Sequence, residues 1–470
     1  MHCLIAGVTC SPRHPSRITV LNLRSMNLVG SISPFIGNLS FLHSLSLINN
    51  SFTGEIPQEI GRLFRLRILW LDDNMLTGKI PQNISSCTQL LHFSSVRNEL
   101  VGGIPPELGS LSKLQKLELS RNHLNGTIPV SLSNLSALDS LYLKSNNLYG
   151  DIPPELGQLS RLEIFQVSEN NLSGTIPPQL CNISSITLFA VAINELDGSI
   201  PPNIDITLPN LQILNLGGNR FHGLLPNSIS NISGLSEIDV IGNQFTGPVP
   251  PNLGRLQGLT RLTFAKNRLG TGAVDDLSFF HSLTNCSHLT MLVIDENNLS
   301  GQLPDSIANL SIKLTILYMG GNRISGQIPS GIQNLVSLNG LIITGNQLTG
   351  SIPSSIGKLS NLAYVDMSNN QLSGQIPSTI GNNTQLETMY LDGNRLQGTI
   401  PASLSNCGKL KTLWLSRNQL VGSIPKQLIG LSSLANQLVL SWNHLTGNLP
   451  VEVGSLEKII SLGLSNNRLQ

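Results

Sequence analysis

The feature that most constrains this sequence is a motif that returns about every 24 residues along the whole chain. It reads L-x-L-x-x-N-x-L, as in Leu69, Leu71, Asn74 and Leu76. The motif's asparagine recurs as Asn50, Asn74, Asn98, Asn122, Asn146, Asn170, Asn194, Asn219, Asn243, Asn267, Asn297, Asn322, Asn346, Asn370, Asn394, Asn418, Asn443 and Asn467. Met26 fills the same slot one unit earlier, which makes 19 units. A chain of 470 residues ordinarily divides into several globular domains, but no linker interrupts this series, so we expect one solenoid.

Within a unit, the spacing of apolar residues indicates two kinds of local structure. Leu69 and Leu71 are two residues apart, as in a short strand, whereas Ile84, Cys87 and Leu90 are three apart, which suits a helical or 3₁₀ turn. One such coil cannot bury its apolar residues alone, but coils stacked about 4.8 Å apart share a core and form a parallel sheet. The predicted fold class is an α/β solenoid superhelix with a concave parallel β-sheet and a convex side of short 3₁₀ or helical turns.

The repeated asparagine has a predicted structural role at the point where each strand ends. Asn74 is expected to turn inward and bond backbone groups of its own and adjacent coils, which would otherwise be buried without partners. Gly78 permits the bend that follows, and Pro81 ends backbone donation there. Such a ladder requires that the units stack in register.

Charge and motifs exclude several classes of function. The chain has 28 Lys and Arg against 27 Asp and Glu, with no basic run, so nucleic acid is not an expected partner. There is no G-x-S-x-G, no H-E-x-x-H and no metal-type spacing of the nine His. Gly270 and Gly272 begin like a dinucleotide loop, but Asp275 stands where the third Gly is needed. We therefore expect no catalytic residue, no metal and no cofactor.

The full unit, LxxLxLxxNxLxGxIPxxLGxLxxL, resembles the plant-specific leucine-rich repeat over essentially the entire chain. The segment HCLIAGVTCSPRHPSRITVLNL resembles the end of the cap before the first repeat of plant leucine-rich-repeat receptor kinases, usually CxWxGVxC. Cys3, Gly7, Val8 and Cys10 match that pattern, while Ile5 replaces the Trp. The irregular segment GTGAVDDLSFFHSLTNCSHL, 270 to 289, resembles a unit of the receptor subfamily that includes flagellin-type and bacterial-pattern sensors.

This resemblance implies a domain organisation and a function. Residues 1–17 would be a remnant of the N-terminal cap, with a Cys3–Cys10 disulfide, and residues 18–470 a continuous solenoid of about 19 repeats, irregular at 268–297. The chain would be the ligand-binding extracellular domain of a plant receptor-like serine/threonine kinase. It would recognise a peptide or protein on its concave face in immune or developmental signalling, and recruit a shorter leucine-rich-repeat coreceptor kinase. Family members lie on the extracellular face of the plasma membrane.

The ends of the chain leave alternatives open. No apolar run reaches the roughly 20 residues of a membrane span, nothing before Cys3 resembles a signal peptide, and the kinase of the parent family is missing. We expect a receptor cut at both ends, as an incomplete product or gene model. The alternatives are a secreted leucine-rich-repeat inhibitor of a microbial cell-wall enzyme, and a truncated product that does not signal.

Cysteines and glycosylation sequons fit the repeat frame. Cys87, Cys286 and Cys407 occupy a slot where other units have an inward Leu, and Cys87 and Cys286 lie eight coils apart, too far to pair. Cys181 has no partner within reach. The N-x-[ST] sequons predict a glycosylated surface, although half of them share one repeat slot whose consensus arises for packing reasons. The sequons are Asn38, Asn49, Asn83, Asn125, Asn134, Asn171, Asn182, Asn231, Asn285, Asn298, Asn309 and Asn382.

Aromatic residues with a polar tip are concentrated at the outward positions of the predicted sheet. They include all three tryptophans and four of the five tyrosines, namely Trp70, Trp414, Trp442, Tyr142, Tyr318, Tyr364 and Tyr390. Five consecutive units carry Tyr318, Ile342, Asp366, Tyr390 and Trp414 in one column, with Tyr364, Asp392 and Arg417 beside it. We predict a ligand-binding strip about 20 Å long, suited to an extended peptide with a basic side chain. Trp70 and Tyr142 are separate candidates, and the alternative reading is that β-propensity alone enriches Tyr and Trp there.

Overall fold

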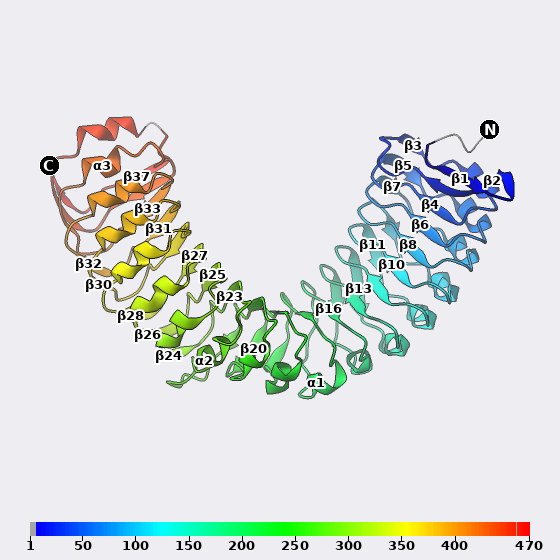
Figure 1. Ribbon diagram of the computed structural model, residues 1–470, viewed down its shortest axis with the longest axis horizontal. Coiled ribbons are helices and arrows are strands. Elements are labelled where there is room, and N and C mark those ends of the chain that lie inside the picture. The colour runs from blue at the N-terminus through cyan, green and yellow to red at the C-terminus, as the bar shows by residue number, and fades with distance from the viewer. Residues whose placement is uncertain (1–5, 457) are drawn as a thin grey trace. The chain divides into compact units, whose positions relative to one another are not determined.

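The computed structural model (Figure 1) describes residues 6–456 and 458–470. The chain divides into two compact units, Met1–His222 and Gly223–Gln470. In each unit the chain winds through successive coils, and each coil adds one strand to a parallel sheet. The predicted α/β solenoid of leucine-rich repeats is therefore confirmed. The domain boundaries at residues 17 and 18 stay a prediction.

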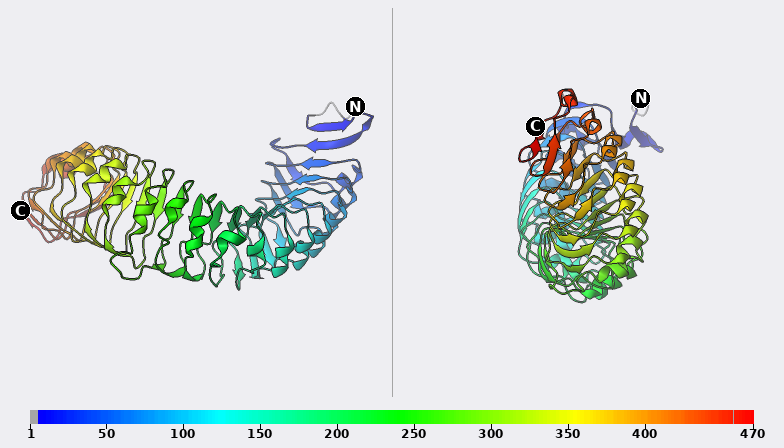
Figure 2. Two further views of the ribbon diagram at one scale, coloured as in Figure 1. Left: turned by 60° about the horizontal axis from the view of Figure 1, so that its bottom comes forward. Right: turned by 90° about the vertical axis from the view of Figure 1, so that its left-hand side faces the viewer.

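The sheet of the first unit begins with an antiparallel pair and continues in parallel. Strand β1 pairs with the first part of β2, and the end of β2 then pairs in parallel with β4. Figure 2 (left) shows these strands stacked as arrows in the blue part of the chain. The strands are β1 (Val8–Ser11), β2 (His14–Asn22), β4 (Ser44–Ser46), β6 (Ile68–Trp70), β8 (His92–Ser94), β10 (Lys116–Glu118), β12 (Ser140–Tyr142), β14 (Ile164–Gln166), β16 (Leu188–Ala190) and β17 (Ile213–Asn215).

Most coils of the first unit continue into a second short strand and then a helical turn. The second strands are β3 (Val29–Ser31), β5 (Ser51–Glu55), β7 (Met75–Thr77), β9 (Val101–Gly102), β11 (His123–Gly126), β13 (Asn147–Asp151) and β15 (Asn171–Ser173). The 3₁₀ turns are Pro34–Asn38, Gln58–Arg62, Gln82–Ser86, Pro106–Ser110, Val130–Asn134, Pro154–Gln158 and Leu180–Asn182, and α1 (Ile204–Thr207) replaces one of them. Strand β18 (His222–Leu224) begins at the boundary residue.

The second unit repeats this plan. Its main strands are β19 (Glu237–Asp239), β21 (Arg261–Thr263), β23 (Met291–Val293), β25 (Ile316–Tyr318), β27 (Gly340–Ile342), β29 (Tyr364–Asp366), β31 (Thr388–Tyr390), β33 (Thr412–Trp414), β35 (Gln437–Val439) and β37 (Ser461–Gly463). From β19 onward, each pairs in parallel with the next, without a register shift.

The remaining elements of the second unit follow the same order within each coil. The second strands are β20 (Gln244–Gly247), β22 (Arg268–Leu269), β24 (Ser300–Gln302), β26 (Arg323–Gln327), β28 (Gln347–Thr349), β30 (Ser373–Gln375), β32 (Arg395–Gln397), β34 (Val421–Gly422), β36 (His444–Gly447) and β38 (Arg468–Leu469). The 3₁₀ turns are Asn227–Asn231, Leu253–Arg255, Asp305–Asn309, Ser330–Asn334, Ser354–Lys358, Ser378–Asn382, Ala402–Asn406 and Val451–Ser455. Two short α-helices, α2 (Phe279–Leu283) and α3 (Lys426–Ile429), take the same place.

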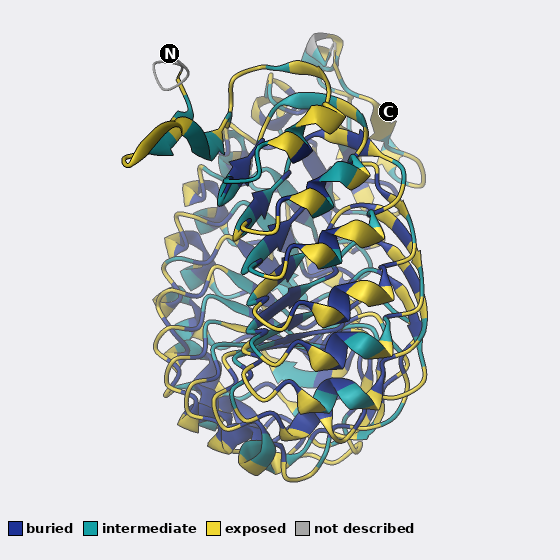
Figure 3. Ribbon diagram, turned by 90° about the vertical axis from the view of Figure 1, so that its right-hand side faces the viewer, coloured by how far each residue is buried: buried dark blue, intermediate teal, exposed yellow. Residues whose placement is uncertain are grey.

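The core lies between the sheet and the helical turns of each coil. In β33, Leu413 is fully buried while its neighbour Trp414 is only half-buried on the outer face of the sheet. Leu404, from the helical turn of the preceding coil, and Leu410 are also fully buried. Figure 3 shows the helical turns carrying both buried and exposed segments, as expected where one side of a turn packs on the core.

The asparagine ladder forms as predicted. The side-chain amide of Asn370 donates to the carbonyl oxygens of Ile343, Met367 and Ser368 at 2.9, 3.3 and 3.0 Å. Its oxygen accepts from the backbone N–H of Leu348 at 3.0 Å. Each ladder residue thus pairs buried backbone groups of its own coil and of the preceding coil, which fixes the register between coils.

The residue just before each ladder asparagine makes a left-handed turn. Gly345 and Gly393 take φ of 62° and 66° there, but Arg417 and Trp442 adopt 52° and 61° in the same slot. A residue with a Cβ is strained in this conformation, so side chains at this slot carry a conformational cost.

The irregular segment is ordered around Asp276. The carboxylate accepts hydrogen bonds from the backbone N–H and hydroxyl of Thr271, at 2.9 and 2.7 Å, and from the hydroxyl of Ser300 at 3.1 Å. Burial alone would raise the pKa of Asp276, but these hydrogen bonds outweigh it and lower the pKa. The segment around Gly270 and Gly272 is thereby built into the coil packing.

The cysteines of the coils are buried and free. This holds for Cys87, Cys181, Cys286 and Cys407, as predicted, and burial raises the pKa of the Cys87 thiol to about 12. The expected Cys3–Cys10 disulfide involves Cys3, which lies outside the described residues, so it stays a prediction. In the described parts of the chain, no helix is both long and apolar enough to cross a membrane.

Candidate ligand-binding surface

The sheet of the second unit brings the predicted strip together. Cross-strand pairing places Tyr318 beside Ile342, Ile342 beside Asp366, Asp366 beside Tyr390 and Tyr390 beside Trp414. These five residues end strands β25, β27, β29, β31 and β33, and we refer to them with Tyr364, Asp392 and Arg417 as the strip. At a strand spacing of about 4.8 Å, four steps cover roughly 19 Å. The structure therefore places the column as the repeat alignment predicts.

Three aromatic rings of the strip contact one another edge to face. The ring centroids of Tyr364 and Tyr390 lie 6.0 Å apart at 67°, and those of Tyr390 and Trp414 lie 5.2 Å apart at 82°. The indole N–H of Trp414 donates to the side-chain oxygen of Gln437 at 3.0 Å. Edge-to-face packing orients the rings, so they form a pre-ordered apolar surface rather than independent side chains.

Tyr318 lies over a glycine of the next strand. A Cβ atom at Gly340 would fall 2.9 Å from the Tyr318 hydroxyl and 3.0 Å from its ring carbon Cε1. Only a residue without a side chain leaves this space, so Gly340 positions Tyr318 at one end of the strip. A glycine inside a predicted strand was the available signal for this contact, but it does not indicate the direction in which the Tyr318 ring leans.

The acidic groups of the strip lie close to its phenols. Asp366 accepts from the backbone N–H and the hydroxyl of Ser368, at 3.0 and 2.6 Å. Burial, together with the nearby charge of Asp366, raises the pKa of Tyr364 to about 12. Burial also raises the pKa of Asp392, as does the charge of Asp366, while Arg417 acts in the opposite sense. At neutral pH the surface therefore combines neutral phenols with carboxylates that form no ion pair with a described residue.

Sequence reasoning missed Asp295, which extends this acidic surface. It follows β23, and its carboxylate raises the pKa of Tyr318, in addition to the effect of burial. Burial raises the pKa of Asp295 itself, with Glu296 acting in the same sense and Lys266 opposing. Their shared position in the repeat was the available signal, because Asp295 and Asp392 each stand two residues before a ladder asparagine.

The other two predicted binding residues lie in the first unit. Trp70 ends β6, and its ring stacks on that of His92 in the next strand, with centroids 6.4 Å apart at 23°. Tyr142 ends β12 between Glu118 and Gln166, and burial and Glu118 raise the pKa of its phenol. Each stands without a second Trp or Tyr beside it in the paired column, so neither builds an aromatic cluster like that of the strip.

The predicted glycosylation sites lie on the surface but away from the strip. Asn298 is half-buried, and the other sequon asparagines are exposed. In the second unit, Asn231, Asn309 and Asn382 end 3₁₀ turns, and Asn285 follows α2, so these four lie outside the sheet. Glycans at these positions would leave the outer face of the sheet uncovered.

Family models for leucine-rich repeats match most of the chain. A leucine-rich repeat region matches residues 17–197, a leucine rich repeat model matches 336–396 and 384–445, and another matches 210–232, 288–310 and 313–335. The sequence is 57% identical over 90 residues to a probable LRR receptor-like serine/threonine-protein kinase of Arabidopsis thaliana. It is 44% identical over 90 residues to the receptor kinase-like protein Xa21 of Oryza sativa subsp. japonica. Each match covers 19% of this chain and 9% of the relative.

Solved structures resemble this chain over most of its length. The ectodomain of the Arabidopsis receptor kinase HAESA, in complex with an N-terminally extended IDA peptide hormone, superposes with a TM-score of 0.86 at 32% identity. That match covers 100% of this chain and 81% of the HAESA chain. The ectodomain of GASSHO1/SCHENGEN3 from Arabidopsis thaliana, in complex with CASPARIAN STRIP INTEGRITY FACTOR 2, gives a TM-score of 0.82 at 32% identity. It covers 95% of this chain and 56% of that one.

Proposed function

This chain belongs to the leucine-rich-repeat ectodomains of plant receptor kinases, and on that premise we propose that it binds an extended peptide on the strip of its second unit. The observation that carries the proposal is the contact of Tyr364, Tyr390 and Trp414 beside two carboxylates on an outward sheet face. Large aromatic side chains supply most of the binding energy in many interfaces, because they bury much area with few rotatable bonds.

The chemistry of the strip favours a ligand with a basic side chain. Asp366 and Asp392 both raise the pKa of Tyr390, after burial, so both carboxylates lie near its phenol. A lysine or arginine placed there would gain two carboxylates and an aromatic face, which favours cations electrostatically. Arg417 at the far end would repel a second cation and favour an anionic group.

The relatives support a peptide as the ligand class. Structures similar to this chain include HAESA with the peptide hormone IDA and the co-receptor SERK1, and RGFR1 with RGF2. By analogy, this chain would bind a peptide outside the cell and then contact a shorter leucine-rich-repeat coreceptor. A cell-wall enzyme inhibitor, the alternative raised by the sequence, is not favoured by these matches. The same proposal includes a role in immune or developmental signalling, membership of the flagellin-sensor subfamily, glycans at the sequons and the Cys3–Cys10 disulfide.

A peptide-binding measurement on the full chain tests the strip. The probes are two pools of labelled synthetic nonapeptides, with one central position fixed as Arg in one pool and as Glu in the other. The wild-type protein should retain the Arg pool. The double variant Tyr390→Ala/Trp414→Ala should lose this binding, because truncation of one hot-spot residue costs about 2 kcal/mol or more of binding free energy. Thermal unfolding should change little, because both side chains lie on the outer face.

The matched control is Tyr149→Ala, which removes an exposed tyrosine of β13, away from the main sheet. It should bind the Arg pool like the wild type. Equal retention of the Arg pool by the strip variant, or equal retention of both pools by the wild type, would contradict the proposal.

A further inference from the structure

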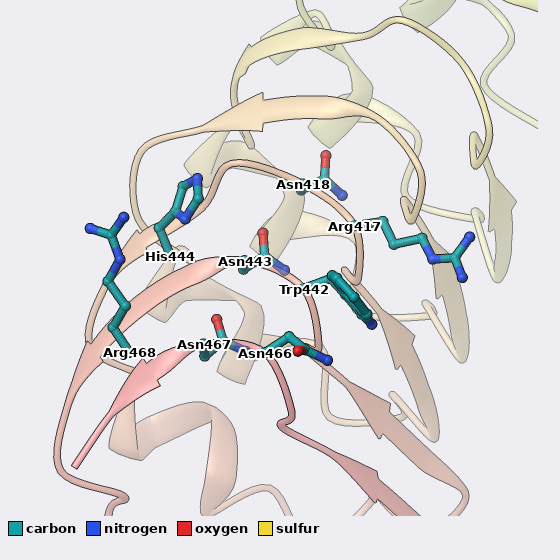
Figure 4. Close-up of a pocket in the computed structure, with 8 residues that line it drawn as sticks. All are labelled: Arg417, Asn418, Trp442, Asn443, His444, Asn466, Asn467 and Arg468. Atoms are coloured by element: carbon teal, nitrogen blue, oxygen red, sulfur yellow. The ribbon is translucent and has the colours of Figure 1, made fainter.

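A furrow runs along the edge of the sheet in the last three coils of the second unit. One side is formed by Arg417, Trp442 and Asn466, the residues just before three ladder asparagines. The other side is formed by His444 and Arg468, the residues just after two of them. Figure 4 shows these two groups on opposite sides of Asn418, Asn443 and Asn467. The furrow encloses about 570 Å³, and none of its lining residues is acidic.

The arginines of the furrow lack the carboxylate partners that some similar positions have elsewhere. Before another ladder asparagine, Arg97 pairs with Asp73 of the preceding coil at 2.5 Å. After other ladder asparagines, His123 pairs with Glu99 at 2.8 Å and Arg220 with Glu195 at 2.9 Å.

Arg417, His444 and Arg468 form no ion pair with any residue that the structure describes. Arg417 opposes the rise that burial causes in the pKa of Asp392, so the two are near each other, but they do not reach ion-pair distance. The positions one coil earlier in the two rows are Gly393 and Gln419, which carry no charge. Arg268, Arg323 and Arg395, at the same position in earlier coils, also form no described ion pair, so the furrow is distinguished by two such arginines beside an exposed tryptophan.

Trp442 gives the furrow an apolar surface at a conformational cost. It is 57% exposed and adopts a left-handed φ of 61° in a slot where Gly393 would be unstrained. The left-handed conformation belongs to this slot in every coil and costs a bulky residue about 1 kcal/mol or more, so the feature particular to Trp442 is its exposed indole. An exposed indole in the same row as Arg417 suits a ligand with both apolar and anionic groups.

We propose that this furrow binds a short acidic segment of a partner protein, one that alternates carboxylate and apolar side chains. Arg417 and Arg468 lie two coils apart, which is about 10 Å at strand spacing. An extended peptide covers that distance in about three residues, so two carboxylates can be matched. A long anionic polysaccharide would have to cross the uncharged positions of Gly393 and Gln419 one coil earlier, whereas a short segment fits within the furrow. The site is separate from the strip, apart from Arg417, which lies between the two.

The test uses the full chain and a labelled hexapeptide, acetyl-Glu-Leu-Glu-Asp-Leu-Glu-amide, whose ends carry no charge. Fluorescence anisotropy compares it with the same peptide carrying Gln and Asn instead of the acids. Binding of the acidic peptide should weaken by about tenfold in Trp442→Ala/Arg468→Gln and should fall with rising salt. The variant keeps Arg417, so binding of the Arg nonapeptide pool to the strip should not change.

Arg97→Gln is the matched control. Arg97 occupies the slot of Arg417 and Trp442, just before a ladder asparagine, but Asp73 already compensates its charge. It should bind the acidic hexapeptide like the wild type. Equal affinity in the wild type and the furrow variant would overturn the proposal. Equal affinity of the wild type for the acidic and the uncharged peptide would also overturn it. Binding of a polygalacturonate fragment without binding of the acidic hexapeptide would do the same.

Discussion

The half-buried carboxylate of Asp392 lowers the free energy of unfolding at neutral pH. It follows the buried Leu391 and is itself half-buried, and burial raises its pKa above the ordinary value of 3.8. A raised pKa means that the folded state holds the proton more tightly than the unfolded state, so ionisation at neutral pH destabilises the fold. A carboxylate kept at such a position is typical of a binding site.

Replacing the Asp392 carboxylate with an amide should therefore stabilise the fold. Asp392→Asn should unfold at a higher temperature than the wild type at neutral pH, because the ionised carboxylate is no longer buried. The difference should shrink as pH falls through the raised pKa and vanish below the ordinary Asp value of 3.8, where both states of the wild type are protonated. Thermal unfolding across pH measures it. Asp305→Asn, in an exposed 3₁₀ turn, is the control, and a constant difference at all pH values would contradict the prediction.

At the scale of elements, short strands fix which side chains meet. Strand β27 offers Gly340 at the position where the ring of Tyr318 from β25 lies across it. The aromatic contacts of the strip likewise run between β29, β31 and β33 rather than within any strand. The parallel register therefore determines the binding surface as much as the side chains do.

Gly340→Ala should move Tyr318 without unfolding the sheet. The added methyl group would meet the flexible end of the Tyr318 side chain, which can swing away, so the unfolding temperature should change little. Affinity for the Arg nonapeptide pool should fall by several fold, up to about tenfold, which is 1.4 kcal/mol. Gly408→Ala is the control, because nothing lies within 4 Å of its added Cβ. Unchanged affinity would remove Tyr318 from the binding surface.

Sequence alone predicted those parts of the structure that depend on the repeat. The alignment on asparagines such as Asn370 fixed the register, and hence the column from Tyr318 to Trp414. It did not show that Tyr318 leans over Gly340, because ring orientation depends on side-chain packing between coils. It also missed the furrow, since an unpaired Arg468 is recognised only when the neighbouring coils prove to lack a carboxylate. Whether the predicted residues bind a ligand was not decided by pattern, because β-propensity enriches the same aromatics.

At the scale of the whole molecule, contacts between coils are local within each unit. Neighbouring coils pair through strands such as β31 and β33, about 24 residues apart in sequence. Stability in such an array is a sum of coil terms and nearest-neighbour terms, so damage to one coil is felt mainly by those beside it.

Leu413→Ala tests this local coupling. The side chain is fully buried in β33, and its truncation should cost about 2 to 5 kcal/mol. Amide hydrogen exchange should speed up in β31, β33 and β35 and stay unchanged in β4, β6 and β8 of the first unit. The control is Leu224→Ala, at a leucine that is 61% exposed. Faster exchange throughout both units would show that the chain unfolds as one cooperative body.

The left-handed slot before each asparagine has a consequence for how such proteins diversify. The backbone there tolerates glycine, arginine and tryptophan alike, at 66°, 52° and 61°, while the amide beneath keeps its bonds. Exchange of one outward side chain therefore alters what the surface attracts and leaves the scaffold intact. Related genes can therefore acquire new ligand specificities through single substitutions at this slot, while the fold stays the same.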